Sequence, residues 1–181
     1  GAVSFGKWKF DGDAAGNYQE NEYNADGQVV GLKTTPYTYA LDGLMVGDQP
    51  QTAYVVGAEL TPIKGLRLSG IFKMYDNNYS DWSPNAREYD GSDADADREQ
   101  VWMAPAYNRL DLHGSYKLPK IGGLDMAITG HVFNALDALY VQDAVDNSPY
   151  NGFGDKLHLP HNAEVFLGTP RYANIGLVIN F

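Results

Sequence analysis

Two histidines, His158 and His161, are the first residues whose types and spacing suggest chemistry, because imidazole nitrogens are common ligands of zinc and other transition metals. They lie in the segment KLHLPHN. Pro160 between them disfavours a helix, on which two histidines about one turn apart would share a face. We therefore expect two polar loop residues, and we predict neither a metal site nor a cofactor for the chain.

An acidic run offers the oxygen ligands that calcium prefers. It lies in the segment DGSDADADRE, and its carboxylates belong to Asp90, Asp93, Asp95 and Asp97. The run lacks the glycine and the glutamate that an EF-hand loop holds at fixed positions. We expect a solvated loop here rather than a calcium site.

The sequence contains no nucleophile elbow, no Walker phosphate loop and no HExxH motif. We predict that the protein is not an enzyme, and we assign no catalytic residue. Lys and Arg number 13 against 23 Asp and Glu, and the formal net charge is −10. This balance argues against nucleic acid as a partner, because phosphate contacts need cationic side chains. Since the chain has no cysteine, disulfides and thiolate metal sites are excluded.

The elements that must position these residues are β-strands. Apolar and polar side chains alternate with the period of two that a strand with one apolar face requires. Turn residues such as Gly and Pro separate the alternating segments, so two hairpins are expected. Their strands and turns are residues 53–61, 62–65 and 66–77, and residues 107–118, 119–123 and 124–134.

Two further strands are expected, a weaker one over residues 2–10 and one over residues 172–181. The latter, YANIGLVINF, alternates up to Phe181, so the chain is expected to stay ordered to its end. Within the first long polar segment we expect a hairpin between Val29–Leu32 and Tyr37–Val46. The long polar segments are residues 11–50, 78–106 and 135–163.

The connections differ in length between the two ends of the expected sheet. Alternating the strand direction back from the C-terminus places both short turns at one end and the long segments at the other. This asymmetry is typical of outer-membrane barrels, whose strands of about 9–11 residues cross the membrane at a tilt. No apolar run approaches the ~18 residues of a membrane helix. We therefore expect an all-β fold, an antiparallel transmembrane β-barrel segment of about six membrane strands, with short periplasmic turns and long extracellular loops.

Five segments, taken in order, resemble the C-terminal part of the β-barrel of TonB-dependent outer-membrane receptors. The longest contains the turns GDQPQ and PIKG, and another contains an Asn-x-x-Asp-x-x-Tyr pattern formed by Asn134, Asp137 and Tyr140. The segments are FGKWKF (5–10), LDGLMVGDQPQTAYVVGAELTPIKGLRLSGIFKMYDNNYSDWSP (41–84), PAYNRLDLHGSYKL (105–118), GHVFNALDALYVQDAVDN (130–147) and GTPRYANIGLVINF (168–181).

The resemblance implies that residues 1–181 are the C-terminal portion of a 22-stranded receptor barrel whose plug domain and earlier strands are absent, and hence a partial barrel. It implies a place in the bacterial outer membrane and a part in the active uptake of a scarce ligand: a siderophore, cobalamin, a metal complex or a glycan. The implied partners are outer-membrane lipid, the missing plug and strands, the inner-membrane TonB complex through that plug, and the β-barrel assembly machinery, which reads the C-terminal strand. Ligand contacts would come from the long loops, and no substrate-binding residue is assigned.

One pair of polar residues is expected inside such a barrel. Pairing Leu118 with Leu124 across the turn sets Asp111 opposite His131 on the inner face. We interpret this pair as part of the lining of a wet lumen, and contact with the plug is the alternative hypothesis.

A different class of protein also fits the alternation. A small self-contained β-barrel, or a secreted β-sandwich binding module, would bury the apolar faces in a core and leave the polar faces solvated, with residues 11–50 supplying further strands. The first residue is Gly1, and no signal peptide follows it. We therefore interpret the chain as processed, truncated or a fragment.

Overall fold

The computed structural model describes residues 1–90, 92, 94–120, 122–150 and 157–180. In these residues the regular structure consists of β-strands and short 3₁₀ helices, and the named strands pair antiparallel throughout. The expected all-β, antiparallel fold is confirmed. No helix in this part of the chain is long and apolar enough to cross a membrane.

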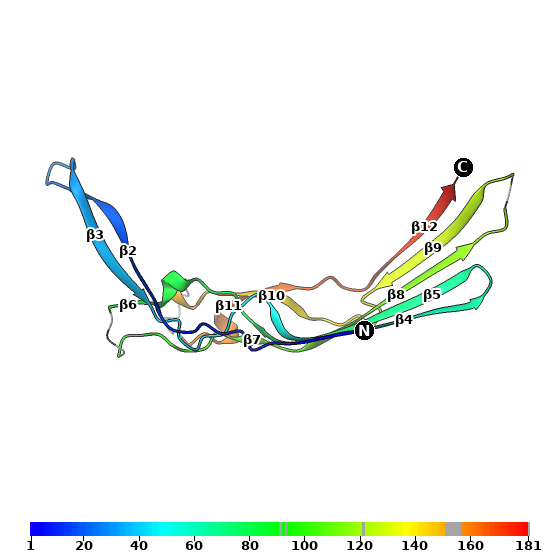
Figure 1. Ribbon diagram of the computed structural model, residues 1–181, viewed down its shortest axis with the longest axis horizontal. Helices are drawn as coiled ribbons and strands as arrows, with labels where there is room; N and C mark the ends of the chain where they lie inside the picture. The colour runs from blue at the N-terminus through cyan, green and yellow to red at the C-terminus, as the bar shows by residue number, and fades with distance from the viewer. Residues whose placement is uncertain (91, 93, 121, 151–156, 181) are drawn as a thin grey trace.

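The largest element is an open sheet, called here the main sheet, with the strand order β1-β4-β5-β8-β9-β12 and with β7 paired to the end of β5 (Figure 1). Among the described residues β1 and β12 are its edge strands, and they do not pair with each other. Its strands are β1 (Ala2–Phe5), β4 (Pro50–Ile63), β5 (Leu66–Tyr79), β7 (Met103–Ala104), β8 (Tyr107–Lys117), β9 (Asp125–Phe133) and β12 (Tyr172–Asn180).

One face of the main sheet is apolar, as the alternation predicts. The register places Leu68 opposite Gly114 and Gly70 opposite Leu112. Each glycine makes room for the leucine across from it, since a Cβ atom at Gly70 would lie 3.3 Å from a methyl carbon of Leu112. The same face carries residues of the other strands at matching register positions: Val3, Phe5, Tyr54, Val56, Leu60, Ile128, Val132, Ile175 and Leu177.

This apolar face is exposed. Ile175 is 85% exposed, Phe5 68% and Leu60 66%. In the described part of the chain, Ala104 of the short strand β7 is the one buried hydrophobic residue of the main sheet. The strands therefore gather their large apolar side chains on one surface without packing another layer of the molecule against it.

Short turns and long connections lie at opposite ends of the main sheet (Figure 1). The turn after β4 is Lys64 and Gly65, and Gly65 has a φ of 87°, a conformation that glycine adopts without a steric cost. The long connections, residues 6–49, 80–106 and 134–171, fold together at the other end and are called here the loop layer.

The loop layer has small sheets of its own. One contains β2 (Ala14–Tyr23), β3 (Val29–Tyr39) and β6 (Glu88–Tyr89), and its β2–β3 hairpin projects far from the main sheet (Figure 1). The other pairs β10 (Val141–Asp146) with β11 (Ala163–Leu167). Short 3₁₀ helices complete the layer: η1 (Pro84–Arg87), η2 (Ser148–Tyr150) and η3 (Pro160–Asn162).

The hairpin expected between Val29–Leu32 and Tyr37–Val46 is wrong. Both sides of it overlap one strand, β3, which pairs with β2 instead. The reversal of the chain occurs earlier, where the Asn24 side-chain oxygen accepts hydrogen bonds from the backbone N–H groups of Asp26 and Gln28 at 3.0 and 2.9 Å. The turn that the Asn24 side chain stabilises therefore favours the pairing of β3 with β2.

The hydrophobic core of the described residues lies in the loop layer rather than in the main sheet. Leu41, Leu44, Trp82 and Val101 form its buried centre. These residues come from two of the long connections, so the core joins segments that are distant in the sequence. The partly buried residues packed around this centre are Phe10, Ala14, Tyr39 and Tyr79.

The first strand is shorter than the expected residues 2–10, because β1 ends at Phe5. The buried side chain of Gln51 takes over the hydrogen bonds of the next segment. Its oxygen accepts from the Trp8 N–H at 3.0 Å, and its amide donates to the Trp8 carbonyl at 3.0 Å. A side chain here replaces the backbone ladder, so the strand stops.

Asn134 fastens the loop layer to the C-terminal end of β9. It is 1% exposed and has a φ of 48°. Its amide group donates to the carbonyls of Ala138 and Thr169 at 3.0 and 3.1 Å, and its side-chain oxygen accepts from the Ala138 N–H at 3.1 Å. One side chain thus holds the segment after β9 next to the segment before β12.

Replacing Asn134 by Ala removes three side-chain hydrogen bonds to the backbone of Ala138 and Thr169. We expect the free energy of unfolding to fall by about 2–3 kcal/mol, since each intramolecular hydrogen bond contributes roughly 0.5–1.5 kcal/mol. Denaturant unfolding of the wild-type and N134A proteins measures the difference. Asn180→Ala, at an exposed position of β12, is the matched control and should change stability by less than about 0.5 kcal/mol. Equal losses in the two variants would contradict the assignment.

Candidate functional site

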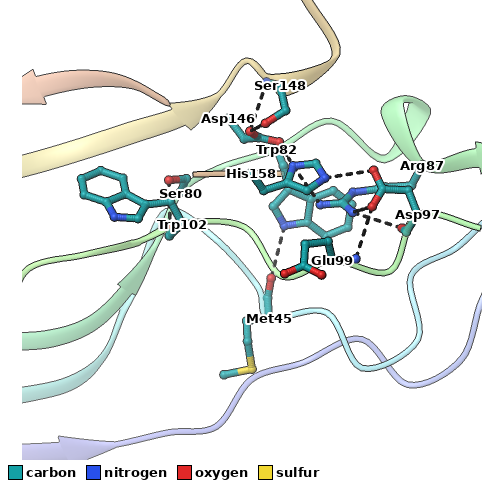
Figure 2. Close-up of polar contacts among 10 residues, drawn as sticks. All are labelled: Met45, Ser80, Trp82, Arg87, Asp97, Glu99, Trp102, Asp146, Ser148 and His158. Carbon is teal, nitrogen blue, oxygen red and sulfur yellow. Dashed lines mark hydrogen bonds and ion pairs between the residues drawn. The ribbon is translucent and has the colours of Figure 1, made fainter. Parts of the chain in front are cut away.

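Four charged side chains from separate segments of the loop layer, three buried and one half-buried, form a group called here the ionic cluster (Figure 2). Arg87 ends η1, Asp97 lies in the acidic run, Asp146 ends β10, and His158 precedes η3. Arg87, His158 and Asp146 are 1%, 2% and 8% exposed. No periodicity connects these residues, and the tertiary fold alone brings them together.

His158 bridges the two carboxylates. Its Nδ1 atom lies 2.7 Å from an oxygen of Asp146, and its Nε2 atom lies 2.9 Å from an oxygen of Asp97. Each ionised carboxylate can only accept a hydrogen bond, so both ring nitrogens must donate. The geometry therefore selects the doubly protonated, positively charged imidazole.

The environment of His158 acts on its pKa in opposite directions. Burial alone would lower the pKa, and the positive charge of Arg87 acts in the same direction. The hydrogen bonds to Asp146 and Asp97 outweigh both effects and raise the pKa of His158 from 6.5 to about 9. His158 is thus charged at neutral pH, unlike an ordinary histidine.

Arg87 completes the charge balance of the cluster. It donates to the Asp97 carboxylate at 2.8 Å and to the Asp97 carbonyl at 3.0 Å, and its guanidinium lies 5.5 Å from the centre of the Trp82 ring. Burial lowers the pKa of Arg87, with the nearby Asp97 opposing that shift. The two cations and two carboxylates together carry no net charge, which reduces the cost of burying them.

The carboxylates gain from the same contacts. Burial alone would raise the pKa of Asp97 and of Asp146, but hydrogen bonds from His158 overcome that effect and lower both pKa values below the ordinary value. The Ser148 N–H and hydroxyl also donate to Asp146. The ionic cluster is therefore a mutually stabilised set of charges that holds the loop segments together.

The cluster contains a serine, a histidine and an aspartate, but not in a nucleophilic arrangement. The Ser148 hydroxyl bonds to the Asp146 carboxylate, while both nitrogens of His158 are occupied by carboxylates (Figure 2). A catalytic serine needs a neutral imidazole that can accept its proton. This geometry supports a structural role for the three residues.

The acidic run divides into exposed residues and one half-buried residue, Asp97. Asp90 and Asp95 are exposed, as expected of a solvated loop. The expectation is wrong for Asp97, because Arg87 and His158 bind its carboxylate. Asp93 lies outside the described residues.

The two loop histidines also differ. Both lie in the connection between β10 and β11, as expected of loop residues, but His161 in η3 is exposed, whereas His158 is buried in the ionic cluster. Among the described residues, no group of three or more histidine, aspartate or glutamate side chains is arranged to hold a metal ion. Both nitrogens of His158 bind carboxylates. Its spacing from His161 in the sequence is unrelated to these contacts.

The expected pairing of Asp111 with His131 is wrong by two positions of register. His131 faces His113, and the Asp111 carboxylate instead bonds to Lys73 at 3.0 Å, with Arg109 at 3.6 Å. The Oδ1 atom of Asp111, which is the one nearest Arg109, also accepts from the Asn134 N–H at 3.0 Å. The face of the sheet is the expected polar one, but the partners differ.

A row of tyrosines lies where the polar face meets the loop layer. The rings of Tyr75 and Tyr107 have centroids 5.2 Å apart, and Tyr107 stacks on Tyr140 at 4.4 Å. The Arg109 guanidinium lies 5.6 Å from the centre of the Tyr140 ring. The row connects β5 and β8 to the segment that follows β9, so the main sheet and the loop layer share one packed junction.

Asp13 forms a second polar junction that the sequence did not reveal. Arg98 donates to its two oxygens at 2.7 Å each, and the Tyr89 hydroxyl donates at 2.8 Å. The Arg98 hydrogen bonds hold the pKa of Asp13 well below its ordinary value. Because Asp13 and Arg98 are 85 positions apart in the sequence, no local pattern could have indicated this pair.

Comparison with known proteins gives no family assignment. A scan of protein-family models found no match, and neither a search of curated proteins nor a search of solved structures found one.

The ionic cluster makes the stability of the loop layer depend on pH. Because the pKa of His158 is higher in the folded state, its contribution is full below pH 6.5 and is lost as pH rises through about 9. The carboxylates have lowered pKa values, so their contribution is lost as pH falls through the acidic range. We expect the free energy of unfolding to fall by roughly 2–3 kcal/mol between pH 6 and pH 10. Denaturant unfolding measures it, followed by the fluorescence of Trp82 in a variant with Trp8 and Trp102 replaced by Phe.

Two variants test the assignment of that alkaline loss. His158→Gln removes the titrating group and should abolish the pH dependence between pH 6 and pH 10, at the cost of lower stability at pH 6. His161→Gln removes an exposed histidine of the same segment and should keep the wild-type profile. An unchanged alkaline loss in H158Q would show that another group carries it.

Proposed function

We propose that this chain is the C-terminal part of the barrel of a TonB-dependent outer-membrane receptor and takes part in the active uptake of a scarce ligand. The observation that carries the proposal is the main sheet, which has an exposed apolar face on one side and a polar face on the other. Supporting it are the five sequence segments that resemble this family.

The apolar face fits lipid better than water. Monomeric soluble proteins rarely expose contiguous apolar patches larger than a few hundred Å². Here Val56, Leu112, Ile175 and Leu177 are 59%, 41%, 85% and 58% exposed on one face, and they come from three strands, β4, β8 and β12. Lipid-facing and lumen-facing side chains alternate in the same way along the strands of outer-membrane barrels.

The two ends of the main sheet fit the same architecture. Short turns at one end and a folded loop layer at the other correspond to periplasmic turns and extracellular loops. The ionic cluster gives the loop layer fixed internal contacts, which suits loops that present a surface to a ligand. The polar face, with Lys73, Arg109 and Asp111, would line the water-filled interior.

The remaining parts of the proposal concern partners. A plug domain and further strands would close the barrel, and the inner-membrane TonB complex would act on that plug. The β-barrel assembly machinery would read the C-terminal strand, whose last residue, Phe181, lies outside the described residues. The ligand would be a siderophore, cobalamin, a metal complex or a glycan.

Fractionation of the bacterium that encodes the chain tests its location. Antibodies raised against residues 1–181 should detect the protein in the outer-membrane fraction, extractable by detergent and not by high salt or alkali. Recovery from the periplasm or the medium without detergent would contradict the proposal and favour a secreted β-sandwich. An outer-membrane protein no longer than this chain would favour a small self-contained barrel.

Transport is tested in a second experiment. Deleting the gene should impair growth when one of the four ligand classes is the scarce nutrient, and deleting the TonB protein of the same bacterium should produce the same defect without an additive effect. Ligand uptake that persists without TonB would contradict this part of the proposal even if the protein lies in the outer membrane.

The two faces predict opposite responses to an added charge. Leu112→Arg, at the middle of β8 on the apolar face, should cost roughly 2–4 kcal/mol of stability in the bilayer. Ser115→Arg, three residues along the same strand on the polar face, should be tolerated. The amount of each variant folded in the outer membrane, and its unfolding midpoint in lipid vesicles, measure the difference. Equal tolerance of the two substitutions would place Leu112 in water.

A further inference from the structure

Two histidines face each other on the polar face of the main sheet. His113 of β8 and His131 of β9 are register partners, and their Nδ1 atoms lie 2.8 Å apart. Two nitrogen lone pairs repel at this separation unless a proton or a metal ion lies between them. Either one ring donates its proton to the other, or both rings can direct their lone pairs to one metal ion.

The separation suits a shared metal ion. Bonds from imidazole nitrogen to a transition-metal ion are about 2.0–2.1 Å long. Two such bonds at a right angle place the nitrogens about 2.9 Å apart, and at a tetrahedral angle about 3.4 Å apart. The two rings therefore need to separate by only a few tenths of an ångström to chelate one ion.

Neighbouring aromatic rings hold the pair in place. The Phe133 ring meets the His113 ring edge to face, with centroids 5.5 Å apart, and lies at 6.1 Å from the His131 ring. Phe133 itself stacks on Tyr172 of β12 at 4.7 Å. Rings already restricted in this way lose little conformational freedom when they bind a ligand.

Oxygen-bearing residues continue the same row across the sheet. Ser69 of β5 is the register partner of His113, and Asn174 of β12 is the register partner of His131. The nearest carboxylate along β8, Asp111, is held by Lys73 at 3.0 Å. The two imidazole nitrogens are therefore the main ligands that this part of the sheet offers to a metal ion. Water can occupy the other coordination positions.

We propose that His113 and His131 form a binding site for a late first-row divalent metal ion, with Cu²⁺ bound more tightly than Ni²⁺ or Zn²⁺. Imidazole suits these ions, and their affinities follow that order for a given set of ligands. Mg²⁺ and Ca²⁺ prefer oxygen ligands and should not compete. The site depends on the hairpin of β8 and β9, so it does not rest on the proposed function.

Titration of the purified protein with Cu²⁺, followed by electron paramagnetic resonance, tests the proposal. We expect a bound signal with hyperfine coupling to two nitrogens. His113→Gln and His131→Gln should each weaken binding by at least about tenfold, the lower range found for lost support of a metal ligand. A millimolar excess of Mg²⁺ should leave the signal unchanged.

His161→Gln is the matched control, because it removes an exposed histidine far along the chain and should leave the signal intact. Identical titrations of the wild-type protein and the H113Q/H131Q double variant would overturn the proposal and leave a proton-sharing pair. Should the variants not fold, carbethoxylation of the unaltered protein decides. Ni²⁺ should protect His113 and His131 from the reagent, and equal modification with and without Ni²⁺ would overturn the site.

Discussion

The rest of the structure depends on one constraint, the exposure of a continuous apolar face on the main sheet. Burying apolar surface is worth roughly 25 cal/mol per Å², so side chains such as Ile175 and Leu60 cannot stabilise this fold while they face water. The described strands offer no second layer to cover them. Their alignment makes sense in an apolar surrounding, and lipid is the surrounding proposed here. In such a surrounding the backbone N–H and C=O groups of the strands must form hydrogen bonds with one another. The antiparallel pairing provides these bonds for the strands between the two edges of the sheet.

The loop layer, in contrast, is stabilised by its own internal contacts and does not need that surrounding. A small core around Trp82 supplies part of its stability, and the ionic cluster supplies fixed links between segments. Each charge of the cluster lies next to its counter-charge, so removing one partner would leave the other without a compensating charge. Such contacts require defined geometry and hence favour one arrangement of the loops. The stacked rings of Tyr107 and Tyr140 connect the loop layer to the main sheet.

Sequence reasoning succeeded where a local rule was sufficient. Alternation with period two located the long strands, and glycine and proline located the short turns. It failed in the loop layer, since the contacts there join residues far apart in the chain. Asp97 and His158 are separated by 61 positions and share no pattern with each other. The misplaced hairpin of residues 11–50 has a different cause. Residues 29–46 were predicted to contain both strands of the hairpin, whereas the chain reverses before Val29, in the turn that the side chain of Asn24 forms.

The wrong register predicted for β8 and β9 shows that the face of a residue is easier to predict than its cross-strand partner. A shift by two positions keeps every side chain on its own face, because the period of a strand is two, but it changes every cross-strand partner. The polar character of the face bearing Asp111 was therefore secure before its partner was known. The pairing of His113 with His131 was not accessible in the same way, since it depends on where the turn ends. Statements about lipid and water thus rest on the faces, which the sequence pattern already determines, while a metal site requires the register that the fold provides.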